Sequence, residues 1–136
     1  METFELKEDI KIICKTVTTF PNYIKEAFDA LQESLPNYEK RNWYGISRLT
    51  ENGEIIYKVA ATELEDGEAE EFGYENYTIK KGAYISETVL DWMKRTQIIG
   101  ETLMTLLEDP RIDQEGYCIE WYKSDDEVLC MIGIEE

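Results

Sequence analysis

The sequence contains no histidine, and its 30 acidic residues outnumber the 14 basic ones. Without histidine the chain has neither the Ser-His-Asp and Cys-His arrangements of nucleophilic enzymes nor histidine-rich zinc sites. It also lacks the Gly-x-Gly-x-x-Gly and Gly-x-x-x-x-Gly-Lys-Ser/Thr motifs that bind phosphate groups. We therefore predict no cofactor and no metal, and any catalysis would depend on carboxylates, tyrosines and water.

The formal net charge of −16 repels the phosphates of nucleic acids and anionic membrane surfaces. No apolar run reaches the length of a membrane-spanning helix, and the acidic N-terminus METFELKEDI is unlike a signal peptide. Cys14, Cys118 and Cys130 are an odd number without a Cys-x-x-Cys pair, which indicates reduced thiols. We predict a cytoplasmic protein without direct contact to nucleic acid or membrane. The charge favours cationic small molecules or basic proteins as partners, unless it serves solubility alone.

The first half of the chain has the pattern β-α-β-β. A strand-like run over residues 4–18 precedes a helical pattern with Asn22 as N-cap and an end before Pro36. Two further strand-like runs flank Asn52-Gly53, and Asn-Gly in such a position is a strong hairpin signal.

The second half repeats this order after the acidic stretch ELEDGEAEEFGYE, which we interpret as a solvated link. Residues 74–89 are strand-like, a helical pattern runs from Leu90 to Leu106, and a second hairpin turns around residues 124–126. A shift of 73 residues aligns the two hairpins without a gap and superposes Tyr44 on Tyr117.

These patterns predict an α+β fold that is a pseudo-two-fold tandem repeat of two β-α-β-β units with antiparallel sheets. The units cover about residues 1–66 and 67–136 of one domain, residues 1–136. We expect a central cleft, because junctions between structural units are common ligand sites.

One acid, Glu120, interrupts the apolar and aromatic strand GYCIEWY. If the hairpin turn has two to four residues, Glu120 shares its face of the sheet with Tyr122, Leu129, Met131 and Gly133. The equivalent Ser47 then shares a mixed face with Ile56, Lys58 and Ala60. A carboxylate in apolar surroundings must be neutral, paired or bound to a ligand. Glu120 is therefore a ligand anchor, a half-exposed strand residue, or the partner of a lysine such as Lys94 or Lys123.

The chain resembles the GyrI-like family, the small-molecule-binding effector domains of bacterial AraC-type and MerR-type transcription regulators. The resemblance rests on YGISRLTENGEIIYKVAAT, KKGAYISETV and CIEWYKSDDEVLCMIGI, and it covers nearly the whole chain. The family's second half runs from a Gly-x-Tyr strand through a helix to an acid-x-Tyr strand, matched here by Gly82, Tyr84, Glu120 and Tyr122.

The resemblance implies multidrug-type binding, in which a central glutamate attracts cationic aromatic compounds that stack on aromatic side chains. Glu120 matches this acid, and a cation gains roughly 0.5–2 kcal/mol per good ring contact. The expected ligand-binding residues are Glu120 together with Trp92, Tyr57, Tyr23, Tyr38, Trp43 and Tyr122. Taken singly, aromatic residues such as these are more typical of a hydrophobic core than of a cleft.

We expect a stand-alone binding protein for a small cationic or aromatic molecule, because no DNA-binding module precedes the repeat. One alternative is a hydrolase of strained electrophilic compounds, with Glu120 as general base and Tyr57 or Tyr122 as acid. Another is an inhibitor that binds a protein partner such as gyrase. A monomer and a homodimer are both compatible with the sequence.

Overall fold

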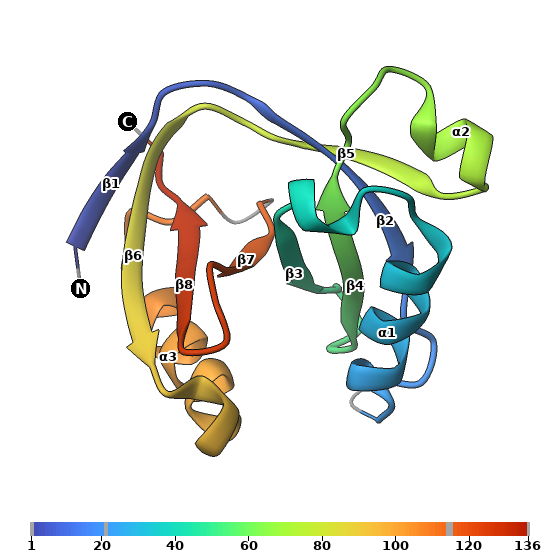
Figure 1. Ribbon diagram of the computed structural model, residues 1–136. Helices are drawn as coiled ribbons and strands as arrows, with labels where there is room; N and C mark the ends of the chain where they lie inside the picture. Colours follow the sequence, from blue (N-terminus) through green and yellow to red (C-terminus); the bar gives the residue numbers. More distant parts are fainter. Residues whose placement is uncertain (1, 21, 114–115, 136) are drawn as a thin grey trace. The chain divides into compact units, whose positions relative to one another are not determined.

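A computed structural model describes residues 2–20, 22–113 and 116–135, which form an α+β fold with antiparallel strand pairing (Figure 1). The chain divides into two compact units. Unit 1 combines Met1–Asp9 with Lys80–Glu136, and unit 2 is Ile10–Ile79. Each unit has four paired strands, one long helix and a hydrophobic core of its own.

Unit 2 has the strand order β3-β4-β2-β5. Helix α1 (Ile24–Ser34) packs on one face of these strands, against β4. The hydrophobic core of unit 2 includes Leu31 of α1 together with Ile13 and Val59 of the strands. The strands are β2 (Ile10–Thr16), β3 (Trp43–Leu49), β4 (Ile55–Thr62) and β5 (Glu75–Ile79), with the short helices η1 (Tyr38–Lys40) and α2 (Glu68–Phe72) in the connections.

Unit 1 has the strand order β1-β6-β8-β7. Helix α3 (Gln97–Leu107) covers one face of β6 and β8 (Figure 1). Leu103 and Leu106 of α3 pack there against Ile85 and Val128. The strands are β1 (Glu2–Leu6), β6 (Gly82–Leu90), β7 (Cys118–Tyr122) and β8 (Glu127–Gly133), and the short helix η2 (Trp92–Lys94) precedes α3.

The internal repeat is confirmed by the elements β2-α1-β3-β4 and β6-α3-β7-β8. Helices α1 and α3 each contain 11 residues. In the first hairpin Leu49 pairs with Ile55, and in the second Tyr122 pairs with Val128. These partners are related by the same shift of 73 residues that aligns the sequences.

The strand predicted over residues 4–18 is in fact two strands that belong to different units. Three charged residues, Lys7 to Asp9, separate β1 from β2, and Asp9 accepts a hydrogen bond of 2.8 Å from the Lys81 amide. Strand β1 pairs with β6, whereas β2 pairs with β4 and β5. The repeat boundary expected after residue 66 therefore falls inside unit 2, because β5 completes that unit.

The helix starts also differ from the prediction. Leu90 is the last residue of β6, and α3 begins only at Gln97, after η2. Asn22 does not cap α1, which begins at Ile24 after Tyr23 in a left-handed conformation with φ of 63°. The Asn22 amide donates instead to the Thr19 carbonyl oxygen at 2.8 Å.

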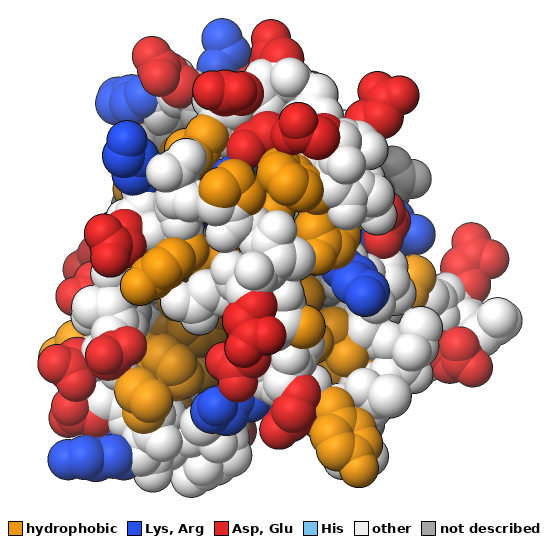
Figure 2. Space-filling view, turned by 45° about the vertical axis from the view of Figure 1, so that its right-hand side comes forward, with side chains coloured by type: hydrophobic (Ala, Val, Ile, Leu, Met, Phe, Trp, Pro, Cys, Tyr) orange, Lys and Arg blue, Asp and Glu red, His pale blue; other side chains and the backbone are white. Residues whose placement is uncertain are grey.

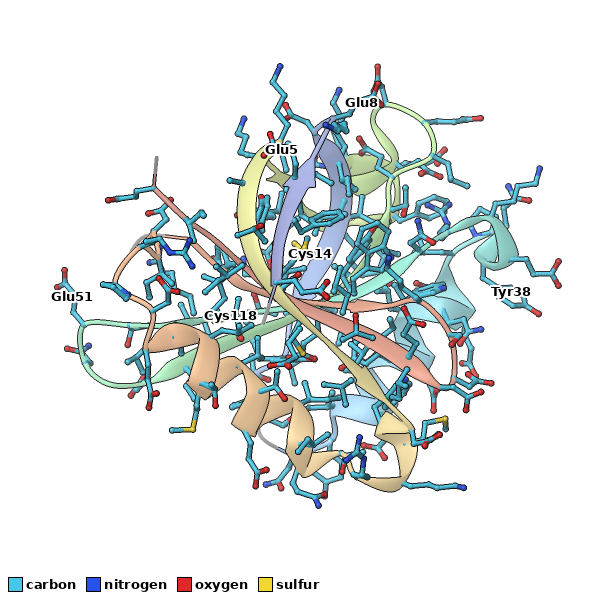
Figure 3. All side chains as sticks on the ribbon, turned by 90° about the vertical axis from the view of Figure 1, so that its left-hand side faces the viewer. Glu5, Glu8, Cys14, Tyr38, Glu51 and Cys118 are labelled. Atoms are coloured by element: carbon cyan, nitrogen blue, oxygen red, sulfur yellow. The ribbon has the colours of Figure 1, made fainter. Side chains whose placement is uncertain are left out.

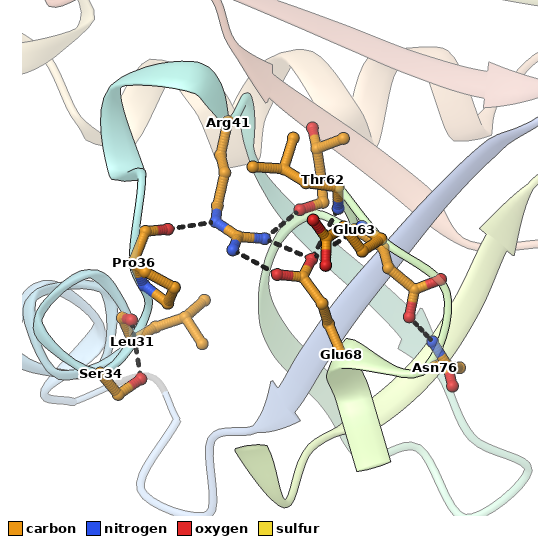
Figure 4. Close-up of polar contacts among 10 residues, drawn as sticks. Leu31, Ser34, Pro36, Arg41, Thr62, Glu63, Glu68 and Asn76 are labelled. Carbon is orange, nitrogen blue, oxygen red and sulfur yellow. Dashed lines mark hydrogen bonds and ion pairs between the residues drawn. The ribbon is translucent and has the colours of Figure 1, made fainter. Parts of the chain in front are cut away.

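The acidic stretch predicted as a solvated link contributes Glu68 to a buried ion pair with Arg41 (Figure 4). The Arg41 guanidinium donates to both carboxylate oxygens of Glu68, at 2.9 and 2.7 Å. Arg41 also donates to the carbonyl oxygens of Pro36 and Thr62, at 3.0 and 2.8 Å. The Leu64 amide donates to Glu68 at 2.6 Å. This pair therefore ties α2 to two connecting segments of unit 2.

The hydrogen bonds from Arg41 lower the pKa of Glu68 to about 2 and outweigh its burial, which acts in the opposite direction. The hydrogen bonds from the amides of Leu64 and Glu65 contribute to this lowering. The side chains of Arg41 and Glu68 are only 0% and 8% exposed. Removing one partner would therefore leave a charge with no access to water.

We expect Arg41→Met to lower the free energy of unfolding by about 3–5 kcal/mol, because the Glu68 carboxylate loses its buried partner. Urea denaturation followed by circular dichroism measures this loss. Lys25→Met is the matched control, since Lys25 pairs with Asp29 at 2.9 Å on the surface of α1. That exposed pair contributes about 0–1 kcal/mol, and equal losses in the two variants would contradict the prediction.

The same pair predicts a loss of stability in acid. The pKa of Glu68 is depressed in the folded chain, so its contribution is present above the unfolded pKa of about 4.3 and is lost as the pH falls toward 2. Between pH 5 and 2, wild type is expected to lose more unfolding free energy than Glu68→Gln. Parallel pH profiles for the two proteins would contradict this assignment.

Candidate functional site

The β7–β8 hairpin places Glu120 on the face of the unit 1 sheet that α3 covers. Glu120 lies directly opposite Cys130 of β8, which lies opposite Glu87 of β6. Residues directly opposite each other in antiparallel strands point to the same face. Cys130 belongs to the core cluster that includes Leu103 and Leu106 of α3. The Glu120 carboxylate therefore enters a core and not a solvated surface.

The face predicted for Glu120 is wrong by one residue of register. Five residues, 123–127, separate the paired Tyr122 and Val128, one more than the longest turn assumed. Since a one-residue slip exchanges the two faces of a strand, the neighbours of Glu120 are Val128, Cys130 and Ile132 in place of Leu129, Met131 and Gly133. Ser47 likewise lies opposite Tyr57, and not on the face of Ile56, Lys58 and Ala60.

Three of the predicted ligand-binding residues form a continuous series in unit 1. Glu120 is 5% exposed, and the Tyr122 hydroxyl donates a hydrogen bond to its Oε1. The Tyr122 ring meets Trp92 edge to face, with ring centroids 5.0 Å apart and an interplanar angle of 64°. The Trp92 indole N–H donates to the Ser124 carbonyl oxygen at 3.0 Å. Both rings are partly exposed, so the series runs from the surface to the buried acid.

The Cys130 thiol beside Glu120 is not a reactive group. Burial raises the pKa of Cys130 most, and together with the negative charges of Glu120, Cys118 and Glu87 it brings this pKa to about 12. The thiol is therefore protonated at neutral pH and is a poor nucleophile and a poor metal ligand. It acts here as a small, polarisable apolar group. The chemistry of this cluster rests with its carboxylates and with the Tyr122 hydroxyl.

The other four predicted ligand-binding residues lie in unit 2. Tyr57 is 4% exposed and stacks on Phe20, with ring centroids 5.1 Å apart, and Trp43 packs against the same core. Tyr23 and Tyr38 are 66% and 47% exposed. Figure 3 shows Tyr38 projecting away from the ribbon. Within unit 2, Tyr57 and Trp43 thus act as core residues, and Tyr23 and Tyr38 as surface residues.

The sequence did not indicate how Lys123 is used. Its ammonium lies 4.6 Å from the centroid of the Trp121 ring, a cation–π contact. Trp121 precedes Tyr122 and follows Glu120, so its side chain points to the opposite face of β7. The sequence offered Lys123 as a possible partner of Glu120, but its ammonium instead lies over the Trp121 ring. Cys130 and Glu87 were also not predicted to lie across the sheet from Glu120, because only the correct register places them there.

Charge on the surface is mixed. Figure 2 shows acidic side chains spread over the visible face, with lysines and arginines between them. Among residues 2–20, 22–113 and 116–135, no helix combines the length and apolar character needed to cross a membrane.

No protein-family model and no curated protein matches this sequence. Three solved structures share its fold over nearly their full length. An integron cassette protein from the mobile metagenome of Vibrio cholerae has a TM-score of 0.67 at 13% identity, with 98% of this chain and 95% of that chain covered. SAV2435 bound to tetraphenylphosphonium has a TM-score of 0.63 at 9% identity, with 98% and 93% covered.

The third structure is a candidate bacterial transcription regulation protein from Staphylococcus aureus MU50. Its TM-score is 0.59 at 11% identity, with 99% of this chain and 97% of that chain covered. At such identities the likeness shows that the chain has the same fold, and this fold includes a ligand-bound protein and a regulator-like protein among its examples.

We expect Tyr122→Phe to lower the free energy of unfolding by about 1.5–3 kcal/mol, the contribution of a hydrogen bond to a charged group. The change removes the hydroxyl that donates to the buried Glu120 and keeps the ring that contacts Trp92. Guanidinium denaturation measures the difference. Tyr38→Phe makes the same chemical change on an exposed ring, and a loss of equal size there would contradict the role of the Tyr122 hydroxyl.

Proposed function

We propose that this chain binds a small organic cation with aromatic groups and that the Glu120 carboxylate is the anchor. The observation that carries the proposal is the series Glu120–Tyr122–Trp92, in which a nearly buried acid continues into two partly exposed rings. A carboxylate enclosed by apolar groups attracts a cation strongly, because little water competes for it. The apolar surroundings favour a cation that is itself weakly hydrated.

The rings of Trp92 and Tyr122 add affinity through their faces. A cation held against an aromatic face gains roughly 0.5–2 kcal/mol, and aromatic groups of the ligand gain further from stacking. The Tyr122 hydroxyl holds the carboxylate in one orientation, so less freedom is lost when the ligand binds. The net charge of −16 adds a long-range attraction for cations.

The fold supports the same ligand class. SAV2435, one of the proteins with this fold, is bound to tetraphenylphosphonium, which carries four aromatic rings around a cationic centre. Another protein with this fold is regulator-like. Together with the resemblance of the sequence motifs, this supports a GyrI-like effector-binding role for the chain.

The test is a calorimetric titration of wild type and Glu120→Gln with tetraphenylphosphonium. Glutamine keeps the shape of the side chain and removes its charge. We expect saturable binding to wild type. For Glu120→Gln we expect a dissociation constant that is roughly 10- to 100-fold higher, which corresponds to the loss of about 1.5–3 kcal/mol from a contact with a charged group. An unchanged affinity of Glu120→Gln for tetraphenylphosphonium would contradict the assignment of Glu120 as the anchor.

Two controls separate the anchor from general electrostatics. Glu101→Gln removes one negative charge on the exposed side of α3, and its affinity is expected to stay within about twofold of wild type. Tetraphenylborate, an anion of the same shape, is expected not to bind. Equal binding of the borate would mean an apolar site without selection for charge.

A further inference from the structure

One flank of α3 is apolar and exposed. It consists of Gly100, Met104 and Leu107, which lie at positions i, i+4 and i+7 and therefore form one stripe along the helix. Met104 is 70% exposed and Leu107 is 44% exposed. The neighbouring stripe with Leu103 and Leu106 is buried in the unit 1 core, so the apolar surface of α3 is wider than that core covers.

Helix α1, the equivalent helix of unit 2, differs in this respect. Its exposed positions include the charged residues Lys25, Glu26, Asp29 and Glu33. Of the two long helices, α3 therefore exposes large apolar side chains, whereas α1 exposes none within Ile24–Ser34. Contiguous exposed apolar surface on a small domain marks sites of interaction.

Gly100 makes this flank suitable for close packing. Glycine destabilises a helix interior relative to alanine, and a Cβ atom placed on Gly100 would meet no atom within 4 Å. Packing within the chain thus gives no reason for glycine at this position. Its absent side chain leaves a gap beside Met104, and a protruding side chain of another helix fits such a gap.

We propose that two copies of the chain associate through this flank, with their α3 helices antiparallel across a two-fold axis near Met104. Leu107 of each copy then lies in the gap at Gly100 of the other, and the two Met104 side chains meet at the axis. A two-fold contact needs one self-complementary patch. The flank meets this need, because it contains both the protruding residue and the gap.

The charges at the helix ends favour the antiparallel arrangement. Lys94 and Arg95 precede α3, and the acidic Glu108 follows it, whereas the next acid, Asp109, is already paired with Arg111 of the same chain at 2.8 Å. An antiparallel pair brings the basic end of each helix toward the acidic end of the other, and it also opposes the two helix dipoles favourably. A parallel pair would bring like charges together.

The dimer is expected to be transient and to depend on salt. One helix flank is smaller than the roughly 1,200–2,000 Å² that stable interfaces bury. Each copy also carries a net charge of −16, and this repulsion weakens when salt screens it. Association through the α3 flank therefore strengthens as ionic strength rises.

Cross-linking of Met104→Cys tests the contact at the axis. Cys14, Cys118 and Cys130 are buried, so the new thiol is the accessible one. Under mild oxidation we expect an interchain disulfide to form at least about tenfold faster than in Met93→Cys. Met93 is 58% exposed in η2, and the antiparallel arrangement keeps its two copies apart. Equal rates in the two variants would overturn the proposal.

Sedimentation velocity of wild type and Gly100→Gln is the second test. Glutamine fills the gap with a polar side chain, and it suits a helix better than glycine does, so the variant remains folded. We expect wild type to dimerise at high concentration, more so at high salt, and Gly100→Gln to stay monomeric. A wild type that is monomeric throughout, or a dimer that Gly100→Gln does not weaken, would refute the proposal.

Discussion

The register between β7 and β8 is the constraint on which the candidate site depends. The pairing of Tyr122 with Val128 sets Glu120 opposite Cys130, and thereby turns its carboxylate toward α3. A slip of one residue would turn the carboxylate to the face of Leu129 and Met131, because side chains alternate along a strand. The burial of Glu120 follows from this register, and so does its place in a series with Tyr122 and Trp92.

Several contacts hold that series in place without a ligand. The Trp92 indole binds the Ser124 carbonyl oxygen in the β7–β8 connection, while its ring meets Tyr122 at the end of β7. The Asp91 amide donates to the Asp126 carbonyl oxygen at 2.7 Å, a second link between η2 and the same connection. The rings are therefore positioned before any ligand arrives, which reduces the entropy lost on binding.

The sequence predicts the repeat well and the contacts poorly. Hairpins and helices carry local signals, such as Asn52-Gly53 and the spacing of apolar residues, and both hairpins are found where they were expected. Turn length carried no comparable signal, so the face of Glu120 was missed. The burial of Glu68 was missed because its partner, Arg41, lies 27 residues earlier. Leu90 fits the helical period but belongs to β6. Aromatic character alone did not distinguish Tyr57, which lies in the core of unit 2, from Trp92, which lies beside Tyr122.

Because of where β1 and β5 lie in the sequence, the strand partners of the two units become available at different times during synthesis. Every strand pair of unit 2 lies within the continuous segment Ile10–Ile79, so this unit can form as soon as that segment leaves the ribosome. Strand β1 precedes unit 2 in the sequence, yet its partner β6 begins only at Gly82, after unit 2. Strand β1 can therefore pair only after the whole of unit 2 and β6 have been made, so unit 1 depends on a contact between distant parts of the sequence.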